Sequence, residues 1–481
     1  MNPENLRSEL AVVVGENYIS DSLYERRLYD HDVAPLPTEV GLIFKTIPDI
    51  VVKPGTTDEV AQIVKYAHDN MIPIVPRGSS SWGYGGTIPT NGGIVLGLVR
   101  LKEITGLDLG GMVVHVGAGV RWLDLLTYLE GKGYTFPVYP SSAPSATIGG
   151  WLATGGLGIG SLKYGHVMEH VKAITVVSPT GEILVLNKET DQGEFEMFFD
   201  SEGTLGIITE VTLKIQPKPE LIKPLLSSFE NYDTLVKVVQ KLIKKPVRPY
   251  FIEIQDGEYL DIKRSIGISV PDVPVLGLFV YEGQASEVQE YSEILRRAVS
   301  EAGGTMHSDE EAKEEWLERF YYMRIKKAGP TLLAGEITFP IPRLQFVLNE
   351  TMKIKKKHNL KLGVKAFVVS DDSILFMPMF LADERKRWKY LAILPVINEI
   401  TEVGLKAGGG PYGIGIWNAF FLKATYGAEK FKELKARKKR LDPKDIMNPG
   451  KLYQVKTRFG IPLWGTLFKL LTSMLWILKY F

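Results

Sequence analysis

The sequence predicts an α+β protein with more than one domain, and three observations support this. The chain has 481 residues, which is more than a single hydrophobic core usually holds. Its 45% apolar and 23% charged residues are typical of a globular protein. Short apolar runs of strand length alternate with amphipathic runs of helical spacing along the chain. Together these features indicate mixed helices and strands in at least two domains.

The first domain begins with a strand–helix–strand unit. Asp49–Val52 is expected to be a strand, and Thr57 to cap a helix over Asp58–Asn70. Ile72–Val75 returns as a strand, so this region should form a small α/β lobe. The same domain is expected to contain strands Gly93–Leu98, Met112–Val116 and Gly206–Gln216, helix Arg121–Lys132, and a hairpin of Val171–Val177 with Glu182–Leu186.

A second domain follows a proline-rich change of pattern at Pro217–Pro219. Apolar strands then alternate with charged helices, as in Val275–Tyr281 followed by Ser286–Ala302, which suits antiparallel strands backed by helices. The run Lys353–Lys357 could attract an anion, but a solvated helix face is the preferred interpretation. The expected limits are 1–47 for an N-terminal segment, 48–220 and 221–405 for the two domains, 406–457 for a glycine-rich closing segment, and 458–481 for a C-terminal helix.

Composition excludes several classes of function. The net charge is +1, so no overall positive field attracts nucleic acid, and no nucleic-acid-binding motif is present. The chain has no cysteine, which excludes disulfides and thiolate-bound iron–sulfur clusters. The N-terminus lacks a basic region followed by an apolar run, so no secretory signal is expected.

Three segments rich in glycine and serine indicate a phosphate site. Pro76–Gly86 follows a strand and can bring several backbone N–H groups to one anion. The second segment, Ala146–Gly150, continues through further glycines to Gly165, and the third is Ser201–Thr209. A lone glycine usually marks only a turn, but three such segments in this order favour a common ligand.

The order and spacing of these segments resemble the flavin-binding domain of the vanillyl-alcohol oxidase / p-cresol methylhydroxylase family. The resemblance runs from about Pro48 to Pro217, and the family's closing signature recurs as Leu441-Asp-Pro, then Asn448-Pro-Gly-Lys451. It implies a two-lobed FAD-binding domain, a substrate (cap) domain with an antiparallel sheet, and a dehydrogenase or oxidase acting on CH–OH groups. The length of the chain and its Asn-Pro-Gly-Lys ending are most similar to those of the D-lactate / glycolate / D-2-hydroxyacid dehydrogenase branch.

The glycine-rich segments and the resemblance together assign the expected FAD contacts. Gly78–Ser81 are the first choice for the pyrophosphate, and Thr147 with Gly149 and Gly150 is the second, on the diphosphate and ribityl side. The resemblance places Glu202, Gly203 and Ile207 at the adenosine. Relatives with a histidyl bond carry it where Ser81 stands, so noncovalent FAD is expected. The full set of expected contacts is Arg77, Gly78, Ser79, Ser80, Ser81, Trp82, Gly83, Pro140, Ser141, Thr147, Gly149, Gly150, Gly155, Tyr164, Glu202, Gly203, Ile207 and Asn448.

The resemblance also suggests a substrate, and the sequence departs from it there. Arg324 matches the branch's carboxylate-binding arginine, although pairing with Glu315 or Glu318 is an equal alternative. Four positions that hold histidine or acidic residues in the branch are Val369, Phe376, Pro411 and Tyr412 here, so no metal is predicted. The remaining catalytic candidates are Tyr412, Lys365 and Asn418, while Asp371 and Asp372 are interpreted as a turn.

The predicted reaction is hydride transfer from a 2-hydroxy acid (D-lactate- or glycolate-like) or related alcohol to FAD. Electrons would then pass to a quinone or a partner protein, because no cluster ligand exists in the chain. The alternatives are oxidation of an apolar or phenolic alcohol, or a flavin-binding subunit of a larger electron-transfer complex.

The C-terminal tail, Phe459–Phe481, is strongly apolar and contains Trp464, Trp476 and Tyr480. It is just long enough to span a bilayer, but Lys469 near its middle argues against spanning. An amphipathic helix lying in the membrane surface is favoured, which would attach the protein peripherally to the cytoplasmic face. The alternative is a helix docked on another subunit or on the chain's own core.

Overall fold

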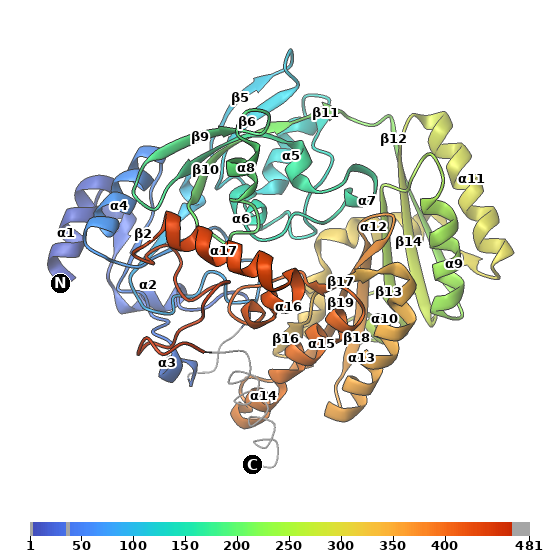
Figure 1. Ribbon diagram of the computed structural model, residues 1–481. Helices are drawn as coiled ribbons and strands as arrows, with labels where there is room; N and C mark the ends of the chain where they lie inside the picture. Colours follow the sequence, from blue (N-terminus) through green and yellow to red (C-terminus); the bar gives the residue numbers. More distant parts are fainter. Residues whose placement is uncertain (1–2, 35–38, 464–481) are drawn as a thin grey trace.

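A computed structural model of the chain describes residues 3–34 and 39–463 (Figure 1). It has the expected α+β architecture, with two lobes that precede a larger domain built on an extended antiparallel sheet. Most of the expected C-terminal helix, residues 464–481, lies outside the described residues. Within the described part of the chain, no helix is both long enough and apolar enough to cross a membrane.

The first lobe is a four-stranded sheet in the order β1-β2-β4-β3. Strands β2 (Ile50–Val52), β4 (Ile94–Gly97) and β3 (Ile74–Arg77) are parallel, and β1 (Ile19–Ser20) joins antiparallel to β2. Helix α4 (Thr57–Asp69) covers this sheet with an apolar face. Its cap is Thr56, whose hydroxyl accepts from the Glu59 amide, one residue before the expected cap.

The N-terminal segment is part of this lobe rather than a separate arm. Helix α1 (Pro3–Val14) contributes Leu6 and Leu10 to the same core as α4. Helices α2 (Leu23–Leu28) and α3 (Val40–Ile43) follow before β2.

The second lobe is a five-stranded antiparallel sheet in the order β5-β6-β10-β8-β9. The expected hairpin is present as β8 (Val171–Val177) and β9 (Ile183–Asn187). Helices α5 (Trp122–Glu130) and α6 (Ile148–Leu152) pack on this sheet, and the rings of Trp122 and Trp151 lie 5.1 Å apart between them. The other elements are β5 (Ile104–Asp108), β6 (Val113–Gly117), β7 (Tyr134–Thr135), α7 (Ser161–Tyr164), α8 (Gln192–Glu196), β10 (Ile207–Lys214) and β11 (Gln216–Pro217).

The cap domain is a nine-stranded antiparallel sheet at the right of Figure 1, in the order β15-β12-β14-β13-β18-β19-β17-β20, with β16 also paired to β19. Its strands are β12 (Leu221–Phe229), β13 (Phe251–Asp256), β14 (Val275–Gly283), β15 (Thr305–Met306), β16 (Thr331–Ala334), β17 (Ile337–Pro340), β18 (Leu362–Val368), β19 (Ser373–Ala382) and β20 (Gly410–Pro411). Its helices are α9 (Tyr232–Ile243), α10 (Gly257–Ser265), α11 (Ala285–Glu301), α12 (Asp309–Leu317), α13 (Leu344–His358), α14 (Arg387–Ile393) and α15 (Pro395–Lys406).

The two faces of the cap sheet have different partners because side chains alternate along a strand. On β18 and β19, Val364, Ala366, Ile374 and Phe376 belong to one core with α9, α11, α13 and α15. Their neighbours Phe367, Leu375 and Met377 belong instead to the core of the second lobe. The cap therefore shares one face with the helices and presents the other to the FAD-binding domain.

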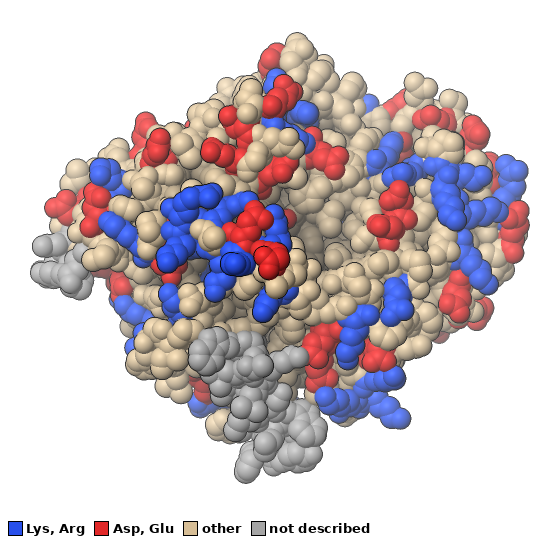
Figure 2. Space-filling model, in the orientation of Figure 1, with Lys and Arg blue, Asp and Glu red and all other residues tan. Residues whose placement is uncertain are grey.

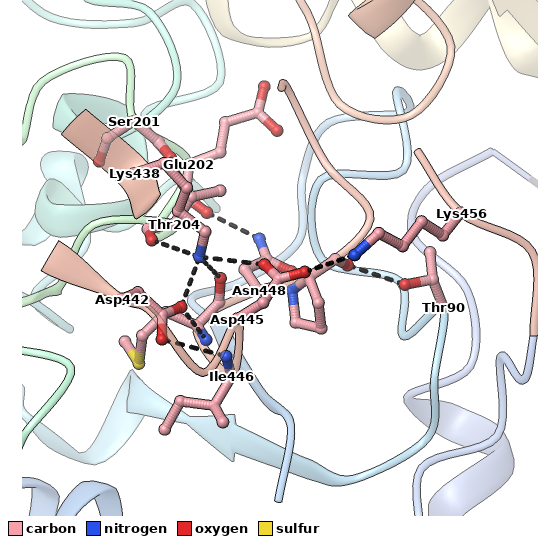
Figure 3. Close-up of polar contacts among 12 residues, drawn as sticks. Thr90, Ser201, Glu202, Thr204, Lys438, Asp442, Asp445, Ile446, Asn448 and Lys456 are labelled. Atoms are coloured by element: carbon pink, nitrogen blue, oxygen red, sulfur yellow. Dashed lines mark hydrogen bonds and ion pairs between the residues drawn. The ribbon is translucent and has the colours of Figure 1, made fainter. Parts of the chain in front are cut away.

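The last segment returns to the first domain through α16 (Leu422–Tyr426) and α17 (Ala428–Leu441). Buried Asp442 accepts from the Lys438 ammonium and from the amides of Ile446 (3.1 Å) and Met447 (2.8 Å) (Figure 3). Lys438 Nζ also donates to the Thr204 carbonyl at 2.9 Å. These contacts explain the aspartate of the signature, because its carboxylate organises the turn after α17.

Asn448 completes this attachment. Its side-chain N–H₂ group donates to the carbonyls of Glu202 (2.7 Å) and Gly86 (2.9 Å), and its backbone amide donates to Ile74. The Thr90 hydroxyl donates to the Pro449 carbonyl at 2.7 Å (Figure 3). The closing signature therefore joins the first and third glycine-rich segments.

Candidate functional site

An elongated cavity runs through the first domain and opens against the cap. One arm lies between the lobes and the other faces the cap sheet. The two arms adjoin each other, because both are lined by residues of the three glycine-rich segments and by Thr87, which follows the first: Gly78, Gly86, Thr87, Thr147, Gly150, Thr154 and Glu202. An extended dinucleotide is a ligand of this shape.

The arm between the lobes is lined by small and apolar residues. Gly149, Gly203 and Ile207, all expected FAD contacts, lie here with Pro76 and Leu98. Arg77 also borders this arm, but its guanidinium donates to the His31 carbonyl at 2.7 Å. The structure thus assigns the Arg77 side chain to holding the N-terminal segment.

The first glycine-rich loop borders the second arm, where Gly78 to Trp82 all line the wall. A Cβ atom at Gly78 would lie 2.3 Å from Thr147 Oγ1, and one at Gly150 would lie 2.7 Å from the same oxygen. Ser80 adopts a positive φ of 55° and hydrogen-bonds Thr87 through its hydroxyl. Small residues are therefore required here, as a backbone cradle for a phosphate demands.

Glu202 lies where the two arms meet and is buried. Its Oε1 accepts from the Gly415 amide at 2.7 Å, whereas Oε2 has no hydrogen-bond partner among the described residues. Burial raises the pKa of this carboxyl to about 7, partly offset by the Gly415 bond and by Lys451. An orphaned acceptor of this kind suits a hydroxyl donor of a dinucleotide and disfavours a phosphate at the same spot. The cavity residues therefore fit FAD.

The arm that faces the cap is aromatic. The Trp82 ring lies 5.5 Å from that of Tyr84 and 5.3 Å from that of Tyr412. Tyr322 and three residues of the sheet face described above, Phe367, Leu375 and Met377, complete the wall. Pro140 and Ser141 border the same arm.

In addition to Glu202, a second carboxyl lines the arm that faces the cap. Glu336 lies at the break between β16 and β17 and lines the cavity. Trp82 Nε1 donates to its Oε2 at 2.8 Å. Removal from water raises the Glu336 pKa to about 7, and the Trp82 bond moderates this rise. A carboxyl with such a pKa exchanges a proton readily near neutral pH.

Glu336 was not among the residues expected from the sequence. The available signal was an acidic residue placed between two apolar strands, directly after Gly335. A Cβ at Gly335 would lie 2.5 Å from the Ile400 side chain, so the glycine lets the strand pass close to α15.

Tyr412 lines the cavity, as expected, but its hydroxyl is engaged with the protein. It donates to the Leu157 carbonyl at 2.9 Å and accepts from the Leu157 amide at 3.1 Å. Burial raises the pKa of this phenol, so it stays protonated and is unsuited to act as a base. Gly155 faces this hydroxyl, because a Cβ there would lie 2.5 Å from it.

The other catalytic candidates lie outside the cavity. Arg324 is 44% exposed and pairs with Glu318 at 2.6 Å, which was the alternative weighed for it. Lys365 forms a buried ion pair with Glu253 at 2.9 Å, behind the Phe367 ring. Asn418 donates to the Gly413 carbonyl at 2.6 Å and accepts from the Thr401 hydroxyl, so its amide supports a turn.

Three expected FAD contacts also have other roles. The Tyr164 hydroxyl donates to Glu282 at 2.7 Å in the cap. Gly83 packs against the N-terminal segment, since a Cβ there would lie 3.0 Å from the Ala34 methyl. Asn448 does not line the cavity but holds two of its loops, as described above.

Phe376, at a position that holds a histidine in the branch, does not face the cavity. Phe376 faces the helix layer, 5.6 Å from the Phe339 ring, and the cavity wall is formed by its neighbours Leu375 and Met377. Asp371 and Asp372 lie in the turn between β18 and β19, where Asp371 pairs with Arg248 at 3.2 Å. Across residues 3–34 and 39–463, no cluster of three histidine or acidic side chains is arranged to hold a metal.

Comparison with known proteins agrees with this architecture. Residues 48–187 match the family model of the FAD-binding domain, and residues 218–452 match that of the C-terminal domain of FAD-linked oxidases. The glycolate oxidase subunit GlcD of Bacillus subtilis is 29% identical over 95% of this chain and 98% of its own. A D-lactate dehydrogenase of Anaerostipes hadrus is 28% identical over 86% and 91%. A substrate-bound p-cresol methylhydroxylase superposes with a TM-score of 0.80 over 94% of this chain and 97% of its own, at 16% identity, which shows a shared fold.

A bulky side chain in the cradle should abolish FAD binding. We expect Gly150→Val to lose the flavin absorbance of the purified protein and the rise in melting temperature on adding FAD, because its side chain would crowd Thr147 at the cavity wall. Gly193→Val is the matched control, since a Cβ there meets nothing within 4 Å. Normal flavin content in Gly150→Val would show that the cradle lies elsewhere.

Proposed function

The chain belongs to the family of FAD-linked oxidases, and from this premise we propose that Glu336 accepts the hydroxyl proton while a CH–OH group is oxidised in the aromatic arm. The observation that carries the proposal is a carboxyl with a pKa near 7 in a cavity that fits FAD. Bound FAD supplies the two-electron oxidant. The proton of the hydroxyl goes to the Glu336 carboxylate, and the product is a carbonyl compound.

Two aromatic residues hold the Glu336 carboxylate in a fixed position. Trp82 fixes Glu336 through its indole N–H and limits the rise in pKa. Tyr412 is held by Leu157 and stacks near Trp82, so its ring forms a rigid wall beside the base. A base held by such neighbours is ready for proton transfer without rearrangement.

The walls of the arm favour an alcohol with an uncharged, apolar body. Phe367, Leu375 and Met377 offer apolar contacts, and among the described residues no lysine or arginine side chain lines the arm. A substrate carboxylate there would lose its hydration without a counter-ion and would lie near Glu336. Arg324, the expected clamp, pairs with Glu318 outside the arm.

A small 2-hydroxy acid is the second candidate substrate. It is favoured by the curated relatives, which carry the names glycolate oxidase and D-lactate dehydrogenase and align over almost the whole chain. A flavin-binding subunit of a larger complex is disfavoured by Glu336, because a scaffold has no need of a base beside its flavin.

Noncovalent attachment of FAD is proposed as well. The chain has no cysteine, and no histidine lines the part of the cavity that the structure describes. The hydroxyls of Tyr84 and Tyr412 are engaged with the Ala334 and Leu157 carbonyls. Acid precipitation should leave the flavin in the supernatant. A yellow pellet would contradict this.

Electrons are proposed to leave for a quinone or a partner protein. With no cysteine in the chain, a thiolate-bound iron–sulfur cluster is excluded as an internal relay. A soluble quinone analogue should therefore sustain faster turnover than oxygen under otherwise equal conditions. Faster turnover with oxygen would identify an oxidase instead.

Glu336→Gln should lower kcat/KM by roughly 10²–10⁴-fold, the usual contribution of a general base. In the unmodified protein kcat/KM should rise with pH through about 7, because the base works only when ionised and its pKa is about 7. Glu336→Gln should lack this rise while keeping its FAD. An unchanged pH profile in Glu336→Gln would assign the base to another group.

Trp82→Phe tests the origin of that pKa. Removing the indole N–H takes away the bond that lowers the Glu336 pKa, so the rise in kcat/KM should move to higher pH. Gln345→Ala, an exposed change on α13, serves as a control.

The substrate class is tested with two matched compounds, mandelate and 1-phenylethane-1,2-diol. Mandelate carries a carboxylate where the diol carries a hydroxymethyl group. The absence of a cation from the described lining predicts a higher kcat/KM for the diol. A higher kcat/KM for mandelate would establish the hydroxy-acid candidate.

A further inference from the structure

Five large apolar side chains are exposed on one side of the molecule. They are Leu42 (73% exposed), Ile43 (38%), Trp388 (45%), Phe459 (74%) and Ile461 (57%), and we call their surface the α3–α14 face. Figure 2 shows a largely uncharged surface at the position that α3 has in Figure 1. Scattered exposed apolar residues are ordinary, but a contiguous group indicates a contact surface.

Hydrogen bonds and an ion pair hold the three parts of this face together. The Arg458 amide donates to the Ile43 carbonyl, and its guanidinium donates to the Gly41 carbonyl at 3.0 Å. Arg387 of α14 forms an ion pair with Glu39, just before α3. The group is therefore a fixed feature of the fold, formed by residues distant in the sequence.

Basic residues lie next to two of the apolar ones, Trp388 and Phe459. Arg385, Lys386, Arg387 and Lys389 flank Trp388 on both sides and are exposed, and Arg458 precedes Phe459. Asp383 pairs with Arg385 and Lys386, and Glu39 pairs with Arg387. With Glu384 there are three carboxylates against five basic residues, so a net positive charge remains. An exposed tryptophan among lysines and arginines is the composition that suits a lipid headgroup region.

The chain also leaves the described structure at this face. Leu463, the last described residue, packs with Phe44 and Val455 directly beneath it. The sequence then continues for residues 464–481 with Trp464, Trp476 and Tyr480, and with Lys469 and Lys479 as its only charges. The apolar tail and the exposed apolar side chains thus start from the same place.

We propose that the α3–α14 face rests on the surface of an anionic lipid bilayer. Leu42, Trp388 and Phe459 enter the headgroup region, and the flanking arginines and lysines contact the lipid phosphates. Lipid is favoured over a protein partner because a net positive charge lies beside the apolar residues and because the apolar tail starts from the same face. The proposal does not depend on the reaction or on its substrate.

The test uses the full chain with FAD bound and vesicles of phosphatidylcholine with or without phosphatidylglycerol. Co-sedimentation should be strong with phosphatidylglycerol and should weaken with salt. The triple variant Leu42→Ser, Trp388→Ser, Phe459→Ser should bind these vesicles at least about tenfold more weakly than the unmodified protein, because it keeps the tail but loses the apolar contacts. Its flavin absorbance and dye-linked turnover should be unchanged.

The control removes equally exposed apolar residues elsewhere, with Leu109→Ser, Val185→Ser and Leu317→Ser, which are 48%, 72% and 55% exposed. Its vesicle binding should equal that of the unmodified protein. The proposal is overturned if the unmodified protein does not sediment with either vesicle, as when the tail covers the face. It is equally overturned if the triple variant binds as well as the control. Flavin content and turnover, measured on the same samples, report separately on the proposed reaction.

Discussion

The side-chain amide of Asn448 is the contact on which the rest of the site depends. It binds the carbonyls of Gly86 and Glu202, which end the first glycine-rich loop and begin the third. Neither loop is held by a sheet at this point, so the bridge through Asn448 fixes their separation beside the cavity. Buried Asp442 orders the turn that carries Asn448 through the Ile446 and Met447 amides. The closing signature is thus a structural requirement of the cofactor site.

Two carboxyls with raised pKa values line the cavity, and their surroundings suit them to different roles. Glu202 and Glu336 both have a pKa near 7 because they are removed from water, yet their neighbours differ. Glu202 is oriented by the Gly415 amide and keeps one oxygen for a ligand hydroxyl, whereas Glu336 is oriented by Trp82 among aromatic rings. Environment, rather than residue type, separates a binding acceptor from a proton acceptor.

The sequence was informative wherever function requires a backbone shape. The loop at Gly78–Trp82 and the β8–β9 hairpin could be predicted because glycine, proline and apolar alternation report local conformation directly. The roles of the catalytic candidates' side chains could not be predicted in the same way. For Arg324 the sequence left a substrate carboxylate and an acidic neighbour as equal alternatives, and the fold selects Glu318. For Lys365 the partner Glu253 becomes visible only in the fold. Glu336 was missed because its neighbours Trp82 and Tyr84 come from another domain. Phe376 was expected at the cavity, but side chains alternate between the two faces of a strand. Phe376 therefore faces the helices, and its neighbours Leu375 and Met377 line the cavity.

The return of the last segment has a consequence for how the protein is made in the cell. Tyr412 and Gly415 line the cavity, and Asn448 bridges two of its loops, yet all three are translated only after the first domain and most of the cap domain. Domains fold in the order in which they leave the ribosome, so the first domain is already folded while its cofactor pocket is still open on one side. The cofactor pocket is therefore complete only once the last segment has been synthesised. A chain that stops before Asn448 lacks the bridge between the two glycine-rich loops.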